Sequence, residues 1–326
     1  MINRNFPCGH QFFVYSNEKY SGNAGNVVAP FYNGLSLSKL YRMVRSMNRA
    51  DIILIHGLFD VKIMLILVLM PWLVRKSKWI IWGGDLYVLK GRNSFRDKLS
   101  SIFKRIIVPN LRSIITYVKG DYEYAVSHYS SKAKFEECIV YPSNFFYYRS
   151  LDKSQPRKRI TKILLGNSAD PQNNHLQALR KLELIDDGNI NLIIPLSYGC
   201  RVNAAHVAKQ AQDLFGDRAI IIDDFMSLDD YNSLLSSVDL AIFCHDRQQA
   251  MGNIITLIGM GKTVVLKRGV SHSEFLTSKG LVYKDFSSLS LETITIEDSV
   301  HNAEIISAYF NESNCVMQLD TIFSGC

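Results

Sequence analysis

A chain of 326 residues with 47% hydrophobic and 21% charged residues is long enough for two ordinary domains, and this composition excludes a disordered, fibrous or low-complexity protein. Six cysteines without a CxxC pair or a histidine-bearing metal spacing exclude a disulfide framework and indicate reduced thiols. The net charge of +7 is uneven, because residues 1–155 carry 22 Lys and Arg against 10 Asp and Glu, while residues 156–326 carry 15 against 20.

Short apolar strands alternate with helical stretches along the whole chain, which is the pattern of parallel sheets covered by helices. The start of the chain has no apolar core of a secretory signal. A Rossmann-like domain normally opens with a strand, but residues 1–6 are polar and helix-like, so the first strand-helix unit is expected to be incomplete. In the first half, strands are predicted at residues 10–15, 51–56, 78–82, 113–118 and 137–141, and helices at residues 37–48, 60–74 and 94–108 and from Asp121 onward.

An aromatic and basic segment without a regular period, residues 143–158, is predicted to be a linker between two domains, residues 1–148 and residues 149–326. After the linker, strands are predicted at residues 163–165, 191–195, 219–222, 239–244 and 263–266, and helices at residues 174–185, 203–215, 228–236 and 252–260. The expected fold is α/β, with two doubly wound domains that bind ligands beyond the carboxyl ends of their strands.

The basic residues of the first half form clusters that suit an anionic membrane surface, an acidic lipid-linked substrate or a nucleic acid; solvated helix faces are the alternative. The clusters are Arg42/Arg45/Arg49, Arg75/Lys76/Lys78, Lys90/Arg92/Arg96/Lys98 and Lys104/Arg105. One apolar run, Ile63 to Val74, is shorter than the roughly 20 residues of a membrane span. It is predicted to be a buried core helix, and a helix at the bilayer surface flanked by Trp72 and basic residues is the competing interpretation.

The segment KILLGNSADPQNNHLQA, residues 162–178, predicts a strand, a glycine-bearing loop and a helix start. Gly166, Asn167 and Ser168 leave room for a ligand near the backbone, and Asp170-Pro171 offers a helix N-cap and first helical position. A diphosphate suits such a place, although an ordinary strand-to-helix turn has the same pattern.

Other strand ends of the second half also present small or polar groups, namely Pro195–Gly199 with Tyr198, Asp223-Asp224, and the run HDRQQ at residues 245–249. The last run precedes Gly252 and Asn253 at a helix start, so Arg247, Gln248 and Gln249 would form a cradle for a nucleotide diphosphate. A P-loop and a GxGxxG motif are both missing from the sequence, so a nicotinamide cofactor is not indicated.

In the first half, the sequence Trp82-Gly83-Gly84-Asp85-Leu86-Tyr87 places a carboxylate at a glycine-rich strand end between two aromatic residues. Asp85 could be a general base for a sugar hydroxyl, or it could cap the next helix. His56 and Lys119, at two other strand ends, could contact phosphate or, for His56, act as a base; structural roles are the alternative.

Four co-linear motifs give the chain a family resemblance: IIWGGDLY, LLGNSADPQNNHLQAL, IPLSYG and DRQQAMGNIITLIGMGKTVVL. They resemble the transferases of glycosyltransferase family 56, which add 4-acetamido-4,6-dideoxy-galactose (Fuc4NAc) from its TDP-sugar to a lipid-linked acceptor in enterobacterial common antigen or O-antigen assembly. The resemblance implies a GT-B fold of two Rossmann-like domains facing a cleft, with no catalytic metal or other cofactor. It also implies a peripheral enzyme at the cytoplasmic face of the inner membrane, with no nucleic-acid partner.

The resemblance implies that the second domain holds the TDP-sugar and that the first meets the polyprenyl-diphosphate-linked acceptor. Asp85 and His56 are the expected catalytic residues, and Trp82, Gly84, Tyr87 and Lys119 are expected at the acceptor. The expected donor-binding residues are Gly166, Asn167, Ser168, Asn174, Tyr198, Arg247, Gln248, Gln249, Gly252 and Asn253.

The family has an extra strand before the region that matches Met1–Phe6, so the chain is expected to be short at its N-terminus; a misassigned start codon is the alternative. Two other functions are the alternatives. The short N-terminus suggests an inactive truncated transferase that acts as a binding subunit, and the fold suggests a nucleotide-sugar epimerase of GT-B-like fold.

Overall fold

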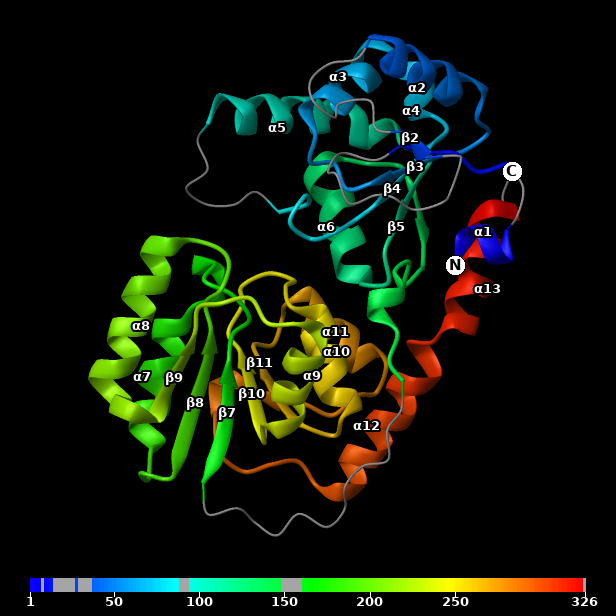
Figure 1. The fold of residues 1–326 in the computed structure, drawn as a ribbon. Helices are drawn as coiled ribbons and strands as arrows, with labels where there is room; N and C mark the ends of the chain where they lie inside the picture. The colour runs from blue at the N-terminus through cyan, green and yellow to red at the C-terminus, as the bar shows by residue number, and fades with distance from the viewer. Residues whose placement is uncertain (7–8, 14–26, 29–36, 88–93, 148–159, 325–326) are drawn as a thin grey trace. The chain divides into compact units, whose positions relative to one another are not determined.

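The computed structural model describes residues 1–6, 9–13, 27–28, 37–87, 94–147 and 160–324. The chain forms two compact units (Figure 1). The first comprises Met1–Tyr117, Tyr122–Cys138 and Val316–Cys326, and the second comprises Val118–Asp121 and Ile139–Cys315. Compared with the predicted division at residue 148, the change of unit falls earlier, after Cys138, and the C-terminal segment returns to the first unit. Most of the predicted linker, residues 148–158, lies outside the described residues.

The first unit is built on a parallel sheet which, among the described residues, has four strands in the order β3-β4-β5-β6. The strands are β3 (Ile53–His56), β4 (Ser77–Ile80), β5 (Ser113–Ile115) and β6 (Lys134–Glu136). Two short strands, β1 (Phe12–Phe13) and β2 (Val27–Val28), form a separate parallel pair. Trp79 and Ile114 are fully buried in the sheet and pack with Met64 and Leu67 of a covering helix.

The helices of the first unit are α1 (Ile2–Asn5), α2 (Leu37–Arg49), α3 (Val61–Leu69), α4 (Pro71–Val74), α5 (Phe95–Ile107), most of α6 (Lys119–Tyr129) and most of α13 (Glu312–Ser324), with the 3₁₀ turn η1 (Val108–Asn110). The predicted helix at residues 60–74 is divided at Met70, because Pro71 cannot continue a helical hydrogen-bond ladder. Asp60 caps its first part by accepting a hydrogen bond from the Lys62 amide at 2.6 Å.

The strand predicted at residues 137–141 is wrong. The strand of that region is β6, which ends at Glu136 and pairs with β5 through Lys134–Glu136. Cys138 and Ile139 are fully buried but lie outside the sheet, and Val140 has a positive φ of 53° that no strand adopts. The apolar run therefore reflects burial in a turn, where Tyr141 N donates to Ile139 O at 2.6 Å.

Lys78 does not belong to a basic surface, which corrects the predicted cluster Arg75/Lys76/Lys78. Its side chain is fully buried in β4, where Nζ donates to Glu136 Oε1 and to the Ile322 carbonyl of α13, both at 2.8 Å. Lys76 Nζ donates to the Asn48 and Ala50 carbonyls at the end of α2, each at 2.7 Å. Two of the three cations therefore hold this unit together.

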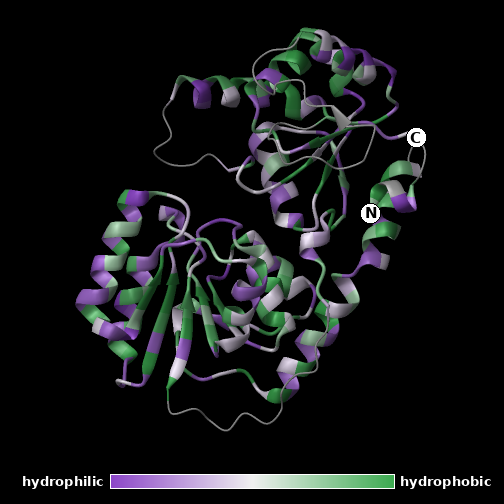
Figure 2. Cartoon of the chain, viewed as in Figure 1, coloured by the Kyte–Doolittle hydropathy of each residue, from purple (hydrophilic) through white to green (hydrophobic). Residues whose placement is uncertain are grey.

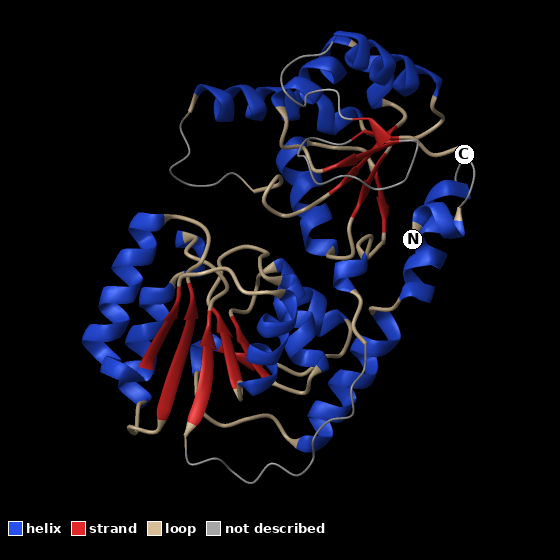
Figure 3. Cartoon of the chain, viewed as in Figure 1, coloured by secondary structure: helices blue, strands red, loops and turns tan. Residues whose placement is uncertain are grey.

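The second unit is built on a parallel sheet, whose strands are red in Figure 3. The described strands follow the order β12-β11-β10-β7-β8-β9. These strands are β7 (Thr161–Leu165), β8 (Ile190–Pro195), β9 (Ala219–Ile222), β10 (Leu240–Phe243), β11 (Thr263–Leu266) and β12 (Lys284–Asp285). The chain runs outward from β7 to β9 and then restarts at β10 on the other side of β7. The order therefore reverses between β7 and β10, which is the switch point of a doubly wound sheet.

The helices of the second unit are α7 (His175–Ile185), α8 (Arg201–Phe215), α9 (Leu228–Ser237), α10 (Met251–Gly259), α11 (Ser271–Ser278) and α12 (Ile296–Tyr309). Its 3₁₀ turns are η2 (Pro142–Asn144), η3 (Pro171–Asn173), η4 (Gly216–Arg218) and η5 (Phe286–Ser288). Figure 1 shows α7 and α8 on one face of the sheet and α9, α10 and α12 on the other, so the central strand β10 is buried along its whole length, whereas the edge strand β9 leaves Ile220 47% exposed.

Candidate functional site

The switch point of the second unit gathers most of the predicted donor residues. β7 pairs with β8 on one side and with β10 on the other, so the segments that follow these strands meet at the carboxyl edge of the sheet. They carry Gly166–Asp170, Tyr198 and His245–Gln249, respectively. Ligands of open α/β sheets bind at this position.

Gly166 has a φ of +71°, and a Cβ atom on it would lie 2.5 Å from His175 Nε2 and 2.7 Å from Asn173 Oδ1. Only glycine fits there, because both the dihedral angle and the space exclude a side chain. The segment therefore turns sharply at the end of β7 and presents its backbone at the edge of the sheet.

Asp170 caps a 3₁₀ turn and not the helix itself, which refines the prediction. Its carboxylate accepts from the Gln172 amide at 2.9 Å, and Pro171 is the first residue of η3. The α-helix begins four residues later, at His175, after Asn174 in the left-handed conformation with φ 50°. The additional turn places Asn173 inside the loop.

Asn173 is 1% exposed and holds the loop together, although the sequence analysis did not select it. Its Oδ1 accepts from the Asn167 amide at 3.0 Å and lies 3.0 Å from His245 Nε2. Its Nδ2 lies 3.2 Å from both Ser168 Oγ and the Asp170 carbonyl. One side chain thus connects the segments that follow β7 and β10.

Three predicted donor residues form one polar cluster beside this loop. Asn167 Nδ2 donates to the Tyr198 hydroxyl at 2.7 Å, and Gln249 Nε2 lies 3.4 Å from Asn167 Oδ1. Asn253, in the first turn of α10, donates to the Tyr231 hydroxyl at 2.8 Å. Desolvation by burial raises the pKa of Tyr198, and it raises that of Tyr231 to about 12, so both hydroxyls stay protonated and uncharged.

Arg247 brings positive charge to the same edge. Its side chain is 11% exposed, Nη1 donates to the Gln248 carbonyl at 3.1 Å, and Nη2 lies 3.5 Å from Asp170 Oδ2. The start of α10 follows directly, after Ala250 with φ 60°, and a Cβ on Gly252 would meet no atom within 4 Å. A guanidinium beside a helix N-terminus favours a phosphate group.

Three buried imidazoles lie beneath the loop, from His175, His245 and His272. Burial lowers the pKa of His175 and of His272 to about 4 and that of His245 well below its usual value. Among the described residues, both ring nitrogens of His175 and of His272 and the Nδ1 of His245 have no hydrogen-bond partner. All three rings are therefore neutral at pH 7 and add no charge to the site.

Asn174 has an internal role in the structure, because its Nδ2 donates to the Cys244 carbonyl at 2.8 Å and to Asp246 Oδ2 at 2.9 Å. Asp246 is also paired with Lys267 at 2.6 Å.

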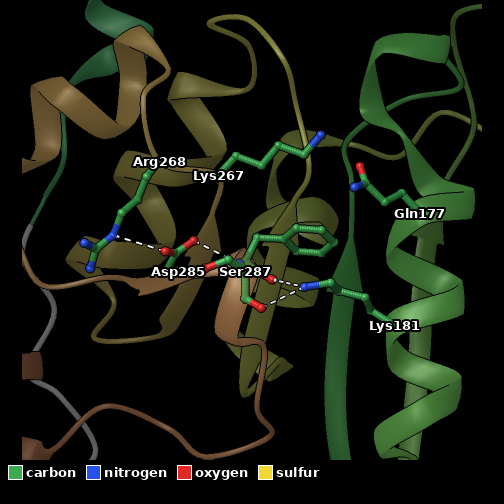
Figure 4. A pocket seen from close by; sticks show the side chains of 7 residues that line it. Gln177, Lys181, Lys267, Arg268, Asp285 and Ser287 are labelled. Carbon is green, nitrogen blue, oxygen red and sulfur yellow. Dashed lines mark hydrogen bonds and ion pairs between the residues drawn. The ribbon is translucent and has the colours of Figure 1, made fainter.

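Lys267 borders a hollow of about 370 Å³, lined by Gln177, Lys181, Lys267, Arg268, Asp285, Phe286 and Ser287 (Figure 4). The other cations that line this hollow also have partners: Arg268 is paired with Asp285 at 3.2 Å, and Lys181 donates hydrogen bonds to two backbone carbonyls.

In the first unit, Asp85 is 1% exposed, and both of its carboxylate oxygens accept hydrogen bonds. Oδ2 accepts from the Leu58 amide at 2.9 Å and from Trp79 Nε1 at 2.7 Å, and Oδ1 accepts from the Trp82 amide at 2.9 Å. Lys104 Nζ donates to the Asp85 carbonyl. The carboxylate therefore joins the segments that follow β3 and β4.

The residues around this carboxylate form an aromatic surface. Trp82 and Phe59 are 53% and 55% exposed, and a Cβ on Gly57 would lie 2.5 Å from the Phe59 ring and 3.2 Å from Trp82 Cδ1. Gly84 is exposed beside Phe59. The sequence analysis did not select Phe59, although its position three residues after His56, just beyond a buried strand, could have indicated it.

The other first-half candidates lie apart from this surface or at its margin. Tyr87 is half-buried and packs on Tyr124 of α6, with 4.9 Å between ring centroids. Lys119 is the first residue of α6 and belongs to the second unit. His56 ends β3 and keeps part of its surface in solvent, while the partial desolvation of its imidazole lowers the pKa.

The chain is similar to known proteins both in its sequence and in its fold. The sequence profile of a family described as "4-alpha-L-fucosyltransferase glycosyl transferase group 56" matches residues 5–309. HepE from Anabaena, solved with UDP, has a TM-score of 0.61 at 12% identity over 92% of this chain and 86% of that chain. Sucrose-phosphate synthase from Thermosynechococcus elongatus gives 0.62 at 13% identity over 88% and 78%.

A third similar structure is WaaG, a glycosyltransferase involved in lipopolysaccharide biosynthesis, with a TM-score of 0.58 at 11% identity over 89% of this chain and 83% of that chain. At such identities the three structures establish the fold, which is GT-B, as predicted.

Proposed function

This chain belongs to glycosyltransferase group 56, and from that premise we propose that it moves Fuc4NAc or a related deoxysugar from a TDP-sugar to a polyprenyl-diphosphate-linked saccharide. The chain is a glycosyltransferase; the donor, the acceptor and the pathway of surface-polysaccharide assembly are the proposal.

One observation supports the donor half most strongly, namely that the carboxyl edge of the second sheet gathers Gly166, Arg247 and the start of α10 at its switch point. Arg247 would bind the diphosphate and stabilise the charge that develops on TDP when its bond to the sugar C1 breaks. The amides of the Gly166 loop and of α10 would hold the same group. Tyr198, Gln249 and Asn253 would orient the nucleotide through uncharged groups.

The acceptor hydroxyl forms the new bond to C1 and loses a proton in the same reaction, so the reaction needs a base. We assign this role to His56, because it ends β3 directly before Gly57, which lies against Phe59 and Trp82 of the aromatic surface, and an imidazole can take up the proton. Asp85 would act as a positioning residue, because its oxygens already accept from three N–H donors and it holds the Trp82 segment. Trp82 and Phe59 would pack against a sugar ring of the acceptor.

A membrane-facing surface of the first unit fits a lipid-linked acceptor. Figure 2 shows hydrophobic and hydrophilic residues interleaved along α2, α3 and α4. The large apolar side chains exposed on these helices are Leu37, Tyr41, Leu65, Leu69 and Trp72. Trp72 Nε1 donates to Asn48 Oδ1 at 2.9 Å, which joins the two helical segments. Arg42, Arg45 and Arg75 are exposed on the same segments. Such a surface suits an anionic bilayer.

Within the described ranges, no helix is long and apolar enough to cross a membrane. We therefore propose peripheral attachment through this surface, at the cytoplasmic face of the inner membrane where the lipid-linked acceptor would be met. The proposed reaction uses no cofactor and no metal.

Calorimetric titration with TDP tests the donor site. Wild-type protein should bind TDP, and Arg247→Ala should weaken binding about 10- to 100-fold, the range for loss of a charge-assisted hydrogen bond. Arg180→Ala, which removes an exposed arginine of α7, is the matched control and should bind as wild type does. Equal affinity in all three proteins would show that Arg247 does not hold the diphosphate.

A further inference from the structure

Two exposed aromatic rings lie side by side at the carboxyl edge of the second sheet. Tyr198 follows β8 and Phe225 follows β9, and these strands are neighbours. Their ring centroids are 6.2 Å apart with an interplanar angle of 16°, so the rings are nearly parallel. Tyr198 is 48% exposed and Phe225 is 79% exposed. Rings so exposed at the ligand-binding edge contribute little to the core.

The Tyr198 ring is fixed in place by a polar contact with the loop after β7. Its hydroxyl accepts from Asn167 Nδ2 at 2.7 Å, and that asparagine is itself next to Gly166. The side chain of Phe225 is entirely apolar and cannot form such a hydrogen bond. The pair therefore consists of one ring fixed by a hydrogen bond and a second, more accessible ring that offers a flat apolar face.

The spacing of the strands places Phe225, the outer ring of the pair, about one nucleoside away from the proposed phosphate site, while Tyr198 lies between the two. β7, β8 and β9 are consecutive, and parallel strands lie about 4.8 Å apart, so β9 ends about 10 Å from the glycine loop of β7. Gly166 and Arg247 lie on the β7 and β10 side, and the aromatic pair lies on the β8 and β9 side.

The two ends differ in charge, which would set the direction of a bound nucleotide. At the β10 end, Arg247 and Lys267 balance the carboxylates of Asp170 and Asp246, whereas the exposed carboxylates Asp223 and Asp224 directly precede Phe225 at the β9 end. A diphosphate is repelled from the carboxylates and attracted to the guanidinium. An uncharged base carries no such penalty beside the carboxylates.

We propose that Tyr198 and Phe225 form the base subsite of the donor, with the pyrimidine ring stacked on these two side chains and the diphosphate at Gly166 and Arg247. This inference rests on the proposed function, because it assigns the second half of the same nucleotide. Stacking accepts any flat base, so the subsite supplies affinity for the nucleoside, and groups elsewhere must select thymine.

The test compares TDP with inorganic pyrophosphate, which has the diphosphate but no base, by calorimetric titration. Phe225→Ala should weaken TDP about tenfold, within the range for loss of one stacking partner of a base, and should leave pyrophosphate affinity unchanged. Leu228→Ala is the matched control, because Leu228 is 75% exposed on the same segment. Tyr198→Phe should retain more TDP affinity than Tyr198→Ala because it keeps the ring.

The outcomes separate this inference from the proposed function. If TDP binds and depends on Arg247, while Phe225→Ala and Leu228→Ala both bind TDP as wild type does, the base subsite is wrong and the donor site remains. If wild-type protein binds neither TDP nor pyrophosphate, both fail together. Because Phe225 is so exposed, its variant should unfold at the wild-type temperature, and an equal loss of TDP and pyrophosphate affinity would also contradict stacking.

Discussion

Single buried side chains hold both candidate sites in shape, and Asn173 is the most connected of them. Asn173→Ala removes a side chain that links Asn167, Ser168, Asp170 and His245 and leaves buried polar groups without partners. We expect the free energy of unfolding to fall by about 2–3 kcal/mol and TDP affinity to fall with it. Urea unfolding and TDP titration measure the two effects, with Gln172→Ala as the neighbouring control. An unchanged variant would mean that the loop is held by other contacts.

Asp85 provides a second prediction at this scale. An asparagine offers one acceptor oxygen and an NH₂ group where three N–H donors now meet a carboxylate, so Asp85→Asn should lower the free energy of unfolding by about 2 kcal/mol. Activity should fall with stability. Asp60→Asn is the control, because asparagine also caps helices well. A protein of wild-type stability that has lost its activity would instead identify Asp85 as the base.

The sequence could reveal Gly166, Tyr198, Arg247 and Gln249, because each follows a buried apolar run at a strand end. It could not reveal Asn173, which lies in the same polar run as Asn174. Only the extra 3₁₀ turn, and the contact with His245 far along the chain, distinguish the two. Likewise, the buried state of Lys78 depends on Glu136 and α13, which no local pattern reports.

At the scale of elements, the loops after β7 and β10 and the helix α11 meet through buried histidines, which makes the second unit sensitive to acid. A histidine whose pKa is lowered on folding stabilises the fold fully above its unfolded pKa, about 6.5, and this contribution is lost as the pH falls. For His175 and His272, with pKa values of about 4, the loss by pH 4 is on the order of 3 kcal/mol each.

Urea unfolding between pH 7 and pH 4 tests this expectation. The free energy of unfolding of the wild type should decline over that interval, and His272→Phe should decline less steeply. His206→Phe, which replaces an exposed histidine of α8, should follow the wild-type curve. Identical slopes for all three proteins would show that the buried imidazoles are not responsible.

The predicted elements agree with the structure where a local sequence pattern is compatible with only one kind of element. Buried strands such as β8 and β10 were predictable from apolar runs, and the start of α5 from its Ser94–Asp97 capping box. The strand at residues 137–141 was wrong because burial in a turn and burial in a sheet give the same apolar pattern. The run Ile63 to Val74 has Met64 and Leu67 in the core, as the core-helix interpretation predicted, and its exposed residues Leu69 and Trp72 leave the contact with a bilayer as a prediction to be tested.

At the scale of the whole molecule, the membrane surface proposed for the first unit can be tested directly. Arg42→Ser with Arg45→Ser should weaken binding to anionic vesicles about 30-fold at low salt, since each basic residue contributes about 1 kcal/mol. Arg180→Ser with Lys209→Ser, two exposed cations of the second unit, is the control pair. Equal vesicle sedimentation of both variants would place the membrane contact elsewhere.

The proposed transfer of a sugar from a TDP-sugar to a lipid-linked acceptor can be measured directly as TDP release from TDP-Fuc4NAc by purified protein, with and without a polyprenyl-diphosphate-linked saccharide. We expect TDP release only when the acceptor is present, with one sugar added to the lipid for each TDP formed. Conversion of the nucleotide-sugar without an acceptor, or no TDP release in either case, would show that the chain does not carry out this transfer.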